Sequence, residues 1–489
     1  MPGSTSLFRP VDGWVGDVLP IWVDGVFHLF YCFLSNTELG TPQLLKGVDL
    51  AHITTRDFVH FEAQPLALKH GGPDDADLLI GAGSILYHSN GYVMFYCGIN
   101  PRRSRTGAAE QVILRATSKD LITWHKDPEF VLEADPKLYE RNDWRDPAVY
   151  WDRDRWRMLL CARIPEGPFD RRGVIGSAES NDLAHWEPTD PLIVSGTTYA
   201  PECPQVIDFG GVRYLLYSTY SDRFATRYRV FNPASDVWTR PPHDELDSHD
   251  VYAMKAVSDG NRHLYLVGWL ATRAGDRDSG HRQWGGDMIV HEVVQRVDNT
   301  LGMRLPTSVA AQFEYRVATF EPREGHWQLT EHEARYNAKG VGWCAVGAVH
   351  DRSIFDVTVN LTSTAEDFGL VVRASKDLRC AYFIRFEPAN QRVVFDRRPH
   401  RIHNPFDYQS DRAYVSATDH EIERPLPIGS REVTCRVMVD GSALVVYVGD
   451  VALTTRGYDL DGGEFGIYAA NGEAHFSDPS LGQPLLFTS

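Results

Sequence analysis

The sequence has few cysteines and arranges none of them in a metal-binding or disulfide framework. Seven cysteines are spread over 489 residues without a C-x-x-C pair. Most of them lie in or beside apolar segments, where free thiols behave as small hydrophobic groups. The odd number and the missing spacing argue for reduced thiols and against a zinc site. No cluster of His, Cys and Asp has ligand spacing either, so we expect no metal and no organic cofactor.

Long hydrophobic runs and an excess of positive charge are also missing. No segment approaches the roughly 18 apolar residues of a membrane span, and residues 1–6 lack the charged and apolar parts of a secretory signal. With 49 Lys and Arg against 66 Asp and Glu, the formal net charge is −17, so a phosphate surface would be repelled. The sequence therefore argues against nucleic-acid and membrane partners, suits a neutral or cationic ligand, and predicts a cytoplasmic location.

What the sequence does contain is a recurring pair of short apolar segments joined by a polar turn. One copy starts at Asp146, runs through residues 148–151, turns at 152–155 and continues through 156–161. Two such segments rich in β-branched and aromatic residues are typical of a β-hairpin. The same pattern follows an acidic residue at Asp17, Glu202 and Asp250, and a further copy has Gly83 and Ser84 at the corresponding point.

The hairpins recur about every 50 to 65 residues. Three of the units close on a second shared pattern, an Asp and an apolar residue followed by an aromatic residue, as in Asp120, Leu121 and Trp124. This pattern predicts a tight turn held by a ring in the core. Units of several strands at this spacing are typical of propeller blades. We predict an all-β protein with a five-bladed β-propeller over residues 1–306; a sandwich with accidental internal similarity is the alternative.

The remainder of the chain alternates between apolar and polar residues with a period of two. Such runs lie at residues 355–361, 382–386, 433–439, 444–448 and 465–469. This pattern predicts a C-terminal antiparallel β-sandwich over residues 307–489. No acidic residues recur in phase there, which favours a structural partner of the propeller over an accessory carbohydrate-contacting module.

Equivalent positions of the blades lie on one ring around a propeller axis. We therefore expect Asp17, Asp146, Glu202 and Asp250 to point toward one shared funnel. Crowded carboxylates raise one another's pKa, and such crowding marks functional sites more often than structural ones. Each acid alone would be interpreted as a solvated turn residue; their shared phase favours a site.

Paired carboxylates perform glycoside hydrolysis. A retaining enzyme holds a nucleophile and an acid/base roughly 5–5.5 Å apart, whereas an inverting enzyme needs a wider gap. Glu202, the one Glu of the ring, has the reach to protonate a leaving-group oxygen, and Asp17 suits the nucleophile. The residues alone do not distinguish Asp146 from Asp17, but Arg145 would keep Asp146 ionised, which favours hydrogen bonds to sugar hydroxyls. Candidates for stacking on a sugar face are Trp14, Trp144, Trp269 and Trp284.

These residues resemble glycoside hydrolase family 32, the family of invertases, levanases and inulinases. Residues 145–147 (Arg-Asp-Pro) and 202–204 (Glu-Cys-Pro) match two of its three signature motifs. The third, Trp-Met-Asn-Asp-Pro-Asn-Gly followed by His-Leu-Phe-Tyr, is partly matched by residues 13–20 and 28–31. Residues 439–444 and 466–472 are similar to the sandwich module of the family, so the resemblance covers nearly the whole chain.

The resemblance implies that Asp17 is the nucleophile, Asp146 the transition-state stabiliser and Glu202 the acid/base. It also implies that Gly83 and Ser84 correspond to a substrate contact in the second blade.

The chain departs from the family pattern around the expected sugar pocket. Gly16 replaces an Asn, residues 18–20 (Val-Leu-Pro) replace Pro-Asn-Gly, and Cys32 stands where the family has Gln. The Trp-Gly pairs expected before His52 are missing as well. The resemblance thus supports the catalytic residues more than it supports hydrolysis of plain sucrose.

We expect a retaining, exo-acting glycoside hydrolase that cleaves terminal β-fructofuranosyl residues of a small-molecule carbohydrate. The predicted catalytic residues are Asp17, Asp146 and Glu202, and the predicted substrate contacts are Trp14, Gly83, Ser84, Arg145, Asp250, Trp269 and Trp284. Alternatives are a furanosidase for another sugar such as arabinofuranose, or a fructosyltransferase. A rival of another class is a non-catalytic carbohydrate-binding propeller, which would have no need of a proton donor.

Overall fold

The computed structural model describes residues 7–35, 47–260, 263–398, 421–426 and 431–485. The chain divides into two compact units, one of Met1–Ala271 with Trp284–Leu301 and one of Thr272–Gln283 with Gly302–Ser489. Residues 1–6, which bear on the predicted location, lie outside the described part. Within the described part no helix is long and apolar enough to cross a membrane; the helices are η3 Pro101–Thr106, η4 Phe169–Arg171, α1 Thr307–Ala310 and η5 Pro388–Asn390. The all-β prediction is confirmed, whereas the boundary after residue 306 stays a prediction.

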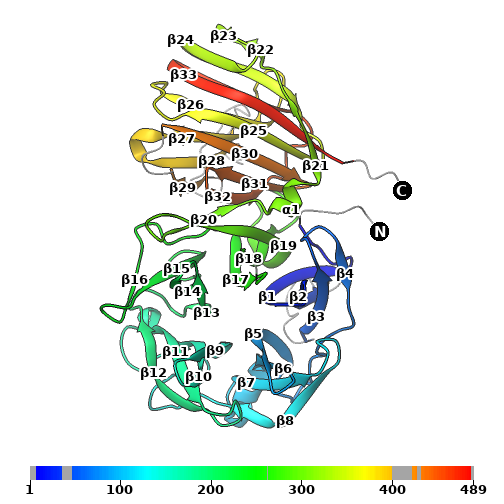
Figure 1. Cartoon of the computed structure of the whole chain (residues 1–489), viewed down its shortest axis with the longest axis vertical. Helices are drawn as coiled ribbons and strands as arrows, with labels where there is room; N and C mark the ends of the chain where they lie inside the picture. The colour runs from blue at the N-terminus through cyan, green and yellow to red at the C-terminus, as the bar shows by residue number, and fades with distance from the viewer. Residues whose placement is uncertain (1–6, 36–46, 261–262, 399–420, 427–430, 486–489) are drawn as a thin grey trace, which may run out of the picture. The chain divides into compact units, whose positions relative to one another are not determined.

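The first unit is the predicted five-bladed propeller, with the first strand of each blade innermost (Figure 1). The blades are β1 Gly13–Val23, β2 Val26–Ser35, β3 Asp49–Thr55 and β4 Phe61–Ala63; β5 Leu79–His88, β6 Gly91–Ile99, β7 Gln111–Ser118 and β8 Trp124–Leu132; β9 Trp144–Asp152, β10 Arg155–Arg163, β11 Gly173–Ser180 and β12 Glu187–Val194; β13 Glu202–Phe209, β14 Val212–Thr219, β15 Ala225–Asn232 and β16 Val237–Thr239; and β17 Val251–Ser258, β18 Leu264–Arg273 and β19 Arg282–Gln295, followed by β20 Leu301–Arg304.

The ring is closed by pairing between the first and fifth blades. They form one continuous sheet in the order β17-β18-β19-β1-β2-β3-β4, in which Val15 of β1 stands opposite Gly286 of β19. The backbones of Phe8 and Met288 add two hydrogen bonds of 3.1 and 2.8 Å. Closure therefore brings the two ends of the propeller sequence side by side.

The predicted closing turns are confirmed in three blades. The carboxylate of Asp120 accepts hydrogen bonds from the backbone N–H groups of Ile122 (2.9 Å) and Thr123 (2.8 Å). Leu121 is buried with φ of +64°, and the Trp124 indole donates to its carbonyl at 3.1 Å. The other turns have the same Asp contacts, with Phe58 and Leu183 as the buried residue at positive φ.

Each innermost strand has a bulge at the same register. The strand advances three residues where its neighbour advances two, at Val15 to Val18, Ile80 to Gly83, Arg145 to Ala148, Glu202 to Gln205 and Tyr252 to Lys255. Side chains alternate between the two faces of a regular strand, and a bulge interrupts that alternation. Three of the bulges contain a non-glycine residue with φ between +49° and +58°, namely Asp146, Cys203 and Ala253. The five bulges form a ring of irregular backbone around the axis.

The second unit is a sandwich of antiparallel strands, as predicted. The long strand β33 (Glu464–Pro484) pairs with β24 and β26 in its first half and with β25 and β21 in its second half. The other strands are β21 Phe313–Val317, β22 Glu321–Glu324, β23 Trp327–Leu329, β24 Glu333–Ala348, β25 Arg352–Asn360, β26 Asp367–Ala374, β27 Ala381–Glu387, β28 Arg392–Arg398, β29 Ile422–Pro425, β30 Glu432–Asp440, β31 Ala443–Val448 and β32 Val451–Arg456. Their inward side chains form one apolar core that includes Phe355, Leu370, Ile384, Val437 and Ile467.

Candidate active site

The three predicted catalytic carboxylates occupy successive positions of the bulge ring. Glu202 is the residue before the bulge on β13, Asp146 is the first bulge residue on β9, and Asp17 is the second on β1. In regular strands, neighbouring positions would point to opposite faces. The bulges instead let all three carboxylates gather at the axis, where Asp146 and Glu202 both act electrostatically on Asp17.

Asp17 is held by a tryptophan of the fifth blade. The indole N–H of Trp269 on β18 donates to its carboxylate at 3.0 Å, across 252 residues of sequence. Trp269 is fully buried, so it has no open face for a sugar, and the prediction that it stacks on substrate is wrong. It orients Asp17 instead.

Glu202 is held on both oxygens. Arg145 donates to Oε1 at 2.9 Å, and the Tyr252 hydroxyl donates to Oε2 at 2.6 Å. The Glu202 side chain keeps 23% of its surface exposed, whereas Asp146 keeps 6%. Asp146 accepts a hydrogen bond from the backbone N–H of Cys203 at 3.0 Å. The glutamate is thus fixed in place and open to a ligand, whereas Asp146 is largely enclosed.

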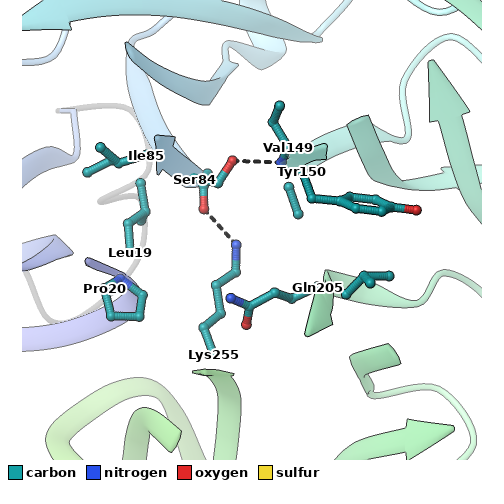
Figure 2. A pocket seen from close by; sticks show the side chains of 11 residues that line it. Leu19, Pro20, Ser84, Ile85, Val149, Tyr150, Gln205 and Lys255 are labelled. Carbon is teal, nitrogen blue, oxygen red and sulfur yellow. Dashed lines mark hydrogen bonds between the residues drawn. The ribbon is translucent and has the colours of Figure 1, made fainter. Parts of the chain in front are cut away.

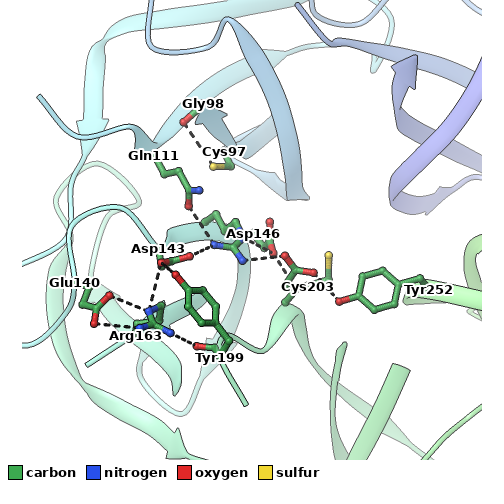
Figure 3. Close-up of polar contacts among 12 residues, drawn as sticks. Cys97, Gly98, Gln111, Glu140, Asp143, Asp146, Arg163, Tyr199, Cys203 and Tyr252 are labelled. Carbon is green, nitrogen blue, oxygen red and sulfur yellow. Dashed lines mark hydrogen bonds and ion pairs between the residues drawn. The ribbon is translucent and has the colours of Figure 1, made fainter. Parts of the chain in front are cut away.

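Arg145 is the centre of a polar network that reaches outward from Glu202. Figure 3 shows the outer part of this network, where Asp143 lies close to Arg163. The Arg145 guanidinium donates to Asp143 at 2.6 Å and to Gln111 at 3.3 Å, and its nearest approach to Asp146 is 3.9 Å. Asp143 in turn lies 3.5 Å from the fully buried Arg163. The described hydrogen bonds of Arg145 go to protein side chains, so its expected contact with substrate stays a prediction and its direct partner is Glu202 rather than Asp146.

The carboxylates are crowded enough to hold a proton near neutral pH. Burial, then the charge of Asp146, raises the pKa of Asp17 to about 7, against the opposing hydrogen bond from Trp269. Burial also raises the pKa of Glu202, but Arg145 and Tyr252 work against it. The ion pair with Arg145 at 2.9 Å favours the ionised form of Glu202. The pKa values of both carboxyl groups are raised, so the pair retains a proton as the pH approaches 7.

Gly16, which departs from the family pattern, lies against the ring of Trp284. A Cβ atom at Gly16 would lie 2.3 Å from the ring of Trp284, which covers this residue beside Asp17. Trp284 is 45% exposed, and its ring centroid lies 5.9 Å from that of Trp269. Trp284 therefore forms an exposed aromatic surface next to Asp17, consistent with its predicted role as a substrate contact.

The other predicted contacts lie in varied surroundings. Asp250 is buried just before β17. It lies two residues before Tyr252, which takes the position in the fifth blade that Glu202 takes in the fourth. Gly83 and Ser84 line an axial cavity. The ring of Trp14 already carries the guanidinium of Arg9 at 4.5 Å. These four stay predictions; Trp144 is fully buried in a core cluster, so its candidacy for stacking was wrong.

Sequence reasoning missed several residues of the site. Tyr252 and Lys255 are in-phase members of the fifth bulge, and Lys255 was the more visible because it interrupts the apolar run of residues 251–257. A lysine in a buried strand is uncommon without a specific partner. The carboxylate of Asp143 had no such signal, because it comes into use only through Arg145.

No group of three or more His, Cys, Asp or Glu in the described ranges is arranged to hold a metal ion. The site consists of carboxylates, two cations and aromatic rings. Such a set can bind a neutral polyhydroxylated ligand, and it can donate and accept protons.

Comparison with known proteins covers almost the entire chain. The sequence model described as "Glycosyl hydrolases family 32 N-terminal domain" matches residues 8–301, and the one described as "Glycosyl hydrolases family 32 C terminal" matches residues 326–481. The sucrose-6-phosphate hydrolase of Escherichia coli is 24% identical over 500 residues, which cover 97% of this chain and 93% of the relative.

Solved structures show the same fold. Fructan 1-exohydrolase IIa from Cichorium intybus matches with a TM-score of 0.72 at 16% identity, covering 99% of this chain and 97% of that chain. Sucrose-6-phosphate hydrolase from Lactobacillus gasseri has the same TM-score and identity and covers 99% and 93%.

Proposed function

The chain belongs to glycoside hydrolase family 32, and on that premise we propose that it releases terminal β-fructofuranosyl residues with retention of configuration. It is a hydrolase of the fructosidase and invertase type. The finer assignment rests on one observation above all: two partly exposed carboxylates, Asp17 and Glu202, converge on the axis with separate supports. Trp269 orients the first, and Arg145 and Tyr252 orient the second.

In the first step, a carboxylate oxygen of Asp17 attacks the anomeric carbon of the fructosyl group. The bond to the glycosidic oxygen breaks, and Glu202 donates its proton to that oxygen, so the leaving group departs as a neutral alcohol. The fructosyl group remains on Asp17 as an ester. Asp146, fixed by the N–H of Cys203, accepts hydrogen bonds from sugar hydroxyls and stabilises the positive charge that develops on the ring.

In the second step, Glu202 acts as a base. It removes a proton from water, whose oxygen attacks the anomeric carbon from the side that the alcohol left, and the ester bond to Asp17 breaks. Two inversions leave the configuration unchanged. If a sugar hydroxyl replaces water at this point, the same residues carry out fructosyl transfer.

Product analysis tests the substrate and the stereochemistry together. We expect release of fructose from the non-reducing ends of a panel that contains sucrose, sucrose 6-phosphate, 1-kestose, inulin and levan, with no cleavage of an aryl arabinofuranoside. NMR spectra recorded in the first minutes should show β-fructofuranose before mutarotation. An initial α-anomer would overturn the double displacement, trisaccharide products would indicate transfer, and binding without turnover would indicate a non-catalytic propeller.

The shared proton predicts the pH profile. The reactive arrangement has Asp17 ionised and Glu202 protonated, and it exists only while the pair holds one proton. Because the pKa of Asp17 is raised to about 7, this last proton is lost as the pH rises through about 7. We expect kcat/KM to be highest on the acidic side of neutrality. Above about pH 7 it should fall about tenfold for each further pH unit. Initial rates between pH 4.5 and 9 provide the measurement, and a constant kcat/KM up to pH 9 would contradict it.

A further inference from the structure

Directly beyond the bulge ring, the propeller axis contains a partly open cavity of about 90 Å³. Its walls come from the innermost strands, at positions that follow the bulges: Leu19 and Pro20, Gly83 to Ile85, Ala148 to Tyr150, Gln205 and Val206, and Lys255. Among these residues only Lys255 carries a charge. It takes the register position that Val18, Gly83, Ala148 and Gln205 take in the other four blades.

The Lys255 side chain crosses the cavity from β17 to β5 (Figure 2). Its ammonium donates to the carbonyl oxygen of Gly83 at 2.6 Å, across 172 residues of sequence. The residue is 2% exposed. Blades 5 and 2 flank blade 1, which carries Asp17. The Lys255 side chain therefore passes beside strand β1, two of whose residues, Leu19 and Pro20, line the same cavity.

A single carbonyl does not account for a buried ammonium, because burying a cation is costly unless negative charge compensates it. Among the carboxylates of the ring, Asp17 is one on which this charge acts. Lys255 acts electrostatically on Asp17 of β1, and it also opposes the burial that raises the pKa of the thiols of Cys32 on β2 and Cys203 on β13.

Two cations therefore serve the carboxylate cluster from different sides. Arg145 forms an ion pair with Glu202, whereas Lys255 acts electrostatically on Asp17. The titratable groups that interact electrostatically with Asp17 include Cys32 on β2, Asp146 on β9, Glu202 and Cys203 on β13, and Tyr252 and Lys255 on β17. Arg145 on β9 acts on Glu202.

We propose that Lys255 is a positioning residue for the catalytic proton: its ammonium stabilises the negative charge of Asp17 and thereby moves the proton shared by the pair toward Glu202. This inference rests on the proposed function, because it takes Asp17 as the nucleophile and Glu202 as the acid. Arg145 has the opposite effect, since it stabilises the ionised form of Glu202. The balance between the two cations sets the fraction of the enzyme with the reactive arrangement.

The Lys255→Met variant tests this balance, because methionine has a similar length without the charge. Without the ammonium, Asp17 should hold its proton about one pH unit more tightly, by the usual effect of a neighbouring charge. We expect the alkaline limb of kcat/KM to move up by about one unit and the maximum value to fall about tenfold. The measurement is the pH profile with sucrose, or with 1-kestose if sucrose is not cleaved. A purely structural lysine would leave the limb where it is.

The matched control is Ile85→Val, which alters the same cavity without changing charge, and its pH limb should be that of the parent enzyme. If Lys255→Met does not fold, Lys255→Arg provides the second variant, since it keeps the charge and should keep the limb. A folded Lys255→Met enzyme whose alkaline limb does not move overturns the inference. A Lys255→Arg enzyme whose alkaline limb moves up by about one pH unit also overturns it, because this variant keeps the positive charge. The Asp17→Asn variant separates the two claims: if it stays active, the proposed function fails, whereas if it is inactive, only the Lys255 result decides the inference.

Discussion

Replacement of Asp17 by asparagine should lower kcat by about four to six orders of magnitude, because the step that forms the fructosyl ester loses its nucleophile. Asparagine has almost the same shape, and its amide oxygen can still accept the hydrogen bond from Trp269 that measures 3.0 Å in the parent protein. The loss should therefore appear in turnover and not in folding. Fructose release under conditions in which each enzyme molecule turns over many times provides the measurement.

The same variant should be at least as stable as the parent enzyme. The pKa of Asp17 is raised to about 7 in the folded protein, so its ionised form costs folding free energy at higher pH, and that cost disappears as the pH falls toward the unfolded value of about 3.9. The gain in Tm should accordingly be larger at pH 8 than at pH 5.

Asp24→Asn is the matched control for this experiment. Asp24 lies in the exposed turn that follows the same strand, with φ of +49°, a conformation that asparagine tolerates. Its activity should equal that of the parent. Near-normal turnover by Asp17→Asn would show that the nucleophile is another group.

Replacement of Glu202 by glutamine should lower kcat about 10²- to 10⁴-fold with a sugar leaving group, because the glycosidic oxygen is no longer protonated as the bond breaks. The size of the loss should depend on the leaving group. With β-fructofuranosyl fluoride, whose leaving group needs no proton, formation of the ester should be nearly as fast as in the parent enzyme. Single-turnover kinetics with the two substrates would measure this difference.

Two further variants distinguish the acid from its supports. Tyr252→Phe removes the hydrogen bond of 2.6 Å to Glu202 but leaves the proton donor, so we expect a loss of about tenfold or less that is similar for both substrates. Glu62→Gln, on the exposed part of β4, should change nothing. If Glu202→Gln were equally slow with the fluoride and with 1-kestose, Glu202 would not be the general acid.

The fold could be predicted from local patterns because each blade repeats the same short sequence pattern. Two apolar runs around a polar turn specify a hairpin wherever they occur, and Asp120 with Leu121 specifies a closing turn through contacts within four residues. Apolar and polar residues alternate with a period of two in the sequence of the sandwich strands, and this alternation predicts them. The first residues of β30 are exposed and buried in turn, as that period requires.

The site was only partly readable, for a physical reason that the bulges make plain. The sequence places the acids at or next to the same point of each innermost strand, and in the structure Glu202, Asp146 and Asp17 stand at three successive positions of the bulge. A bulge depends on pairing with the neighbouring strand, so its effect on side-chain direction is not written in the local sequence. For the same reason the sequence predicts that Trp269 stacks on substrate, whereas in the structure its indole N–H donates a hydrogen bond to Asp17.

The sequence by itself determined the number of blades, the sandwich that follows them and the carboxylates most suited to the chemistry, because those depend on periodicity and residue type. The tertiary structure decided which groups support each carboxylate and how strongly burial raises the pKa of Asp17 and Glu202. Those properties arise from contacts across the axis, such as Arg145 with Glu202 and Lys255 with Gly83. Their energies depend on distance and burial, which exist only once the ring has closed.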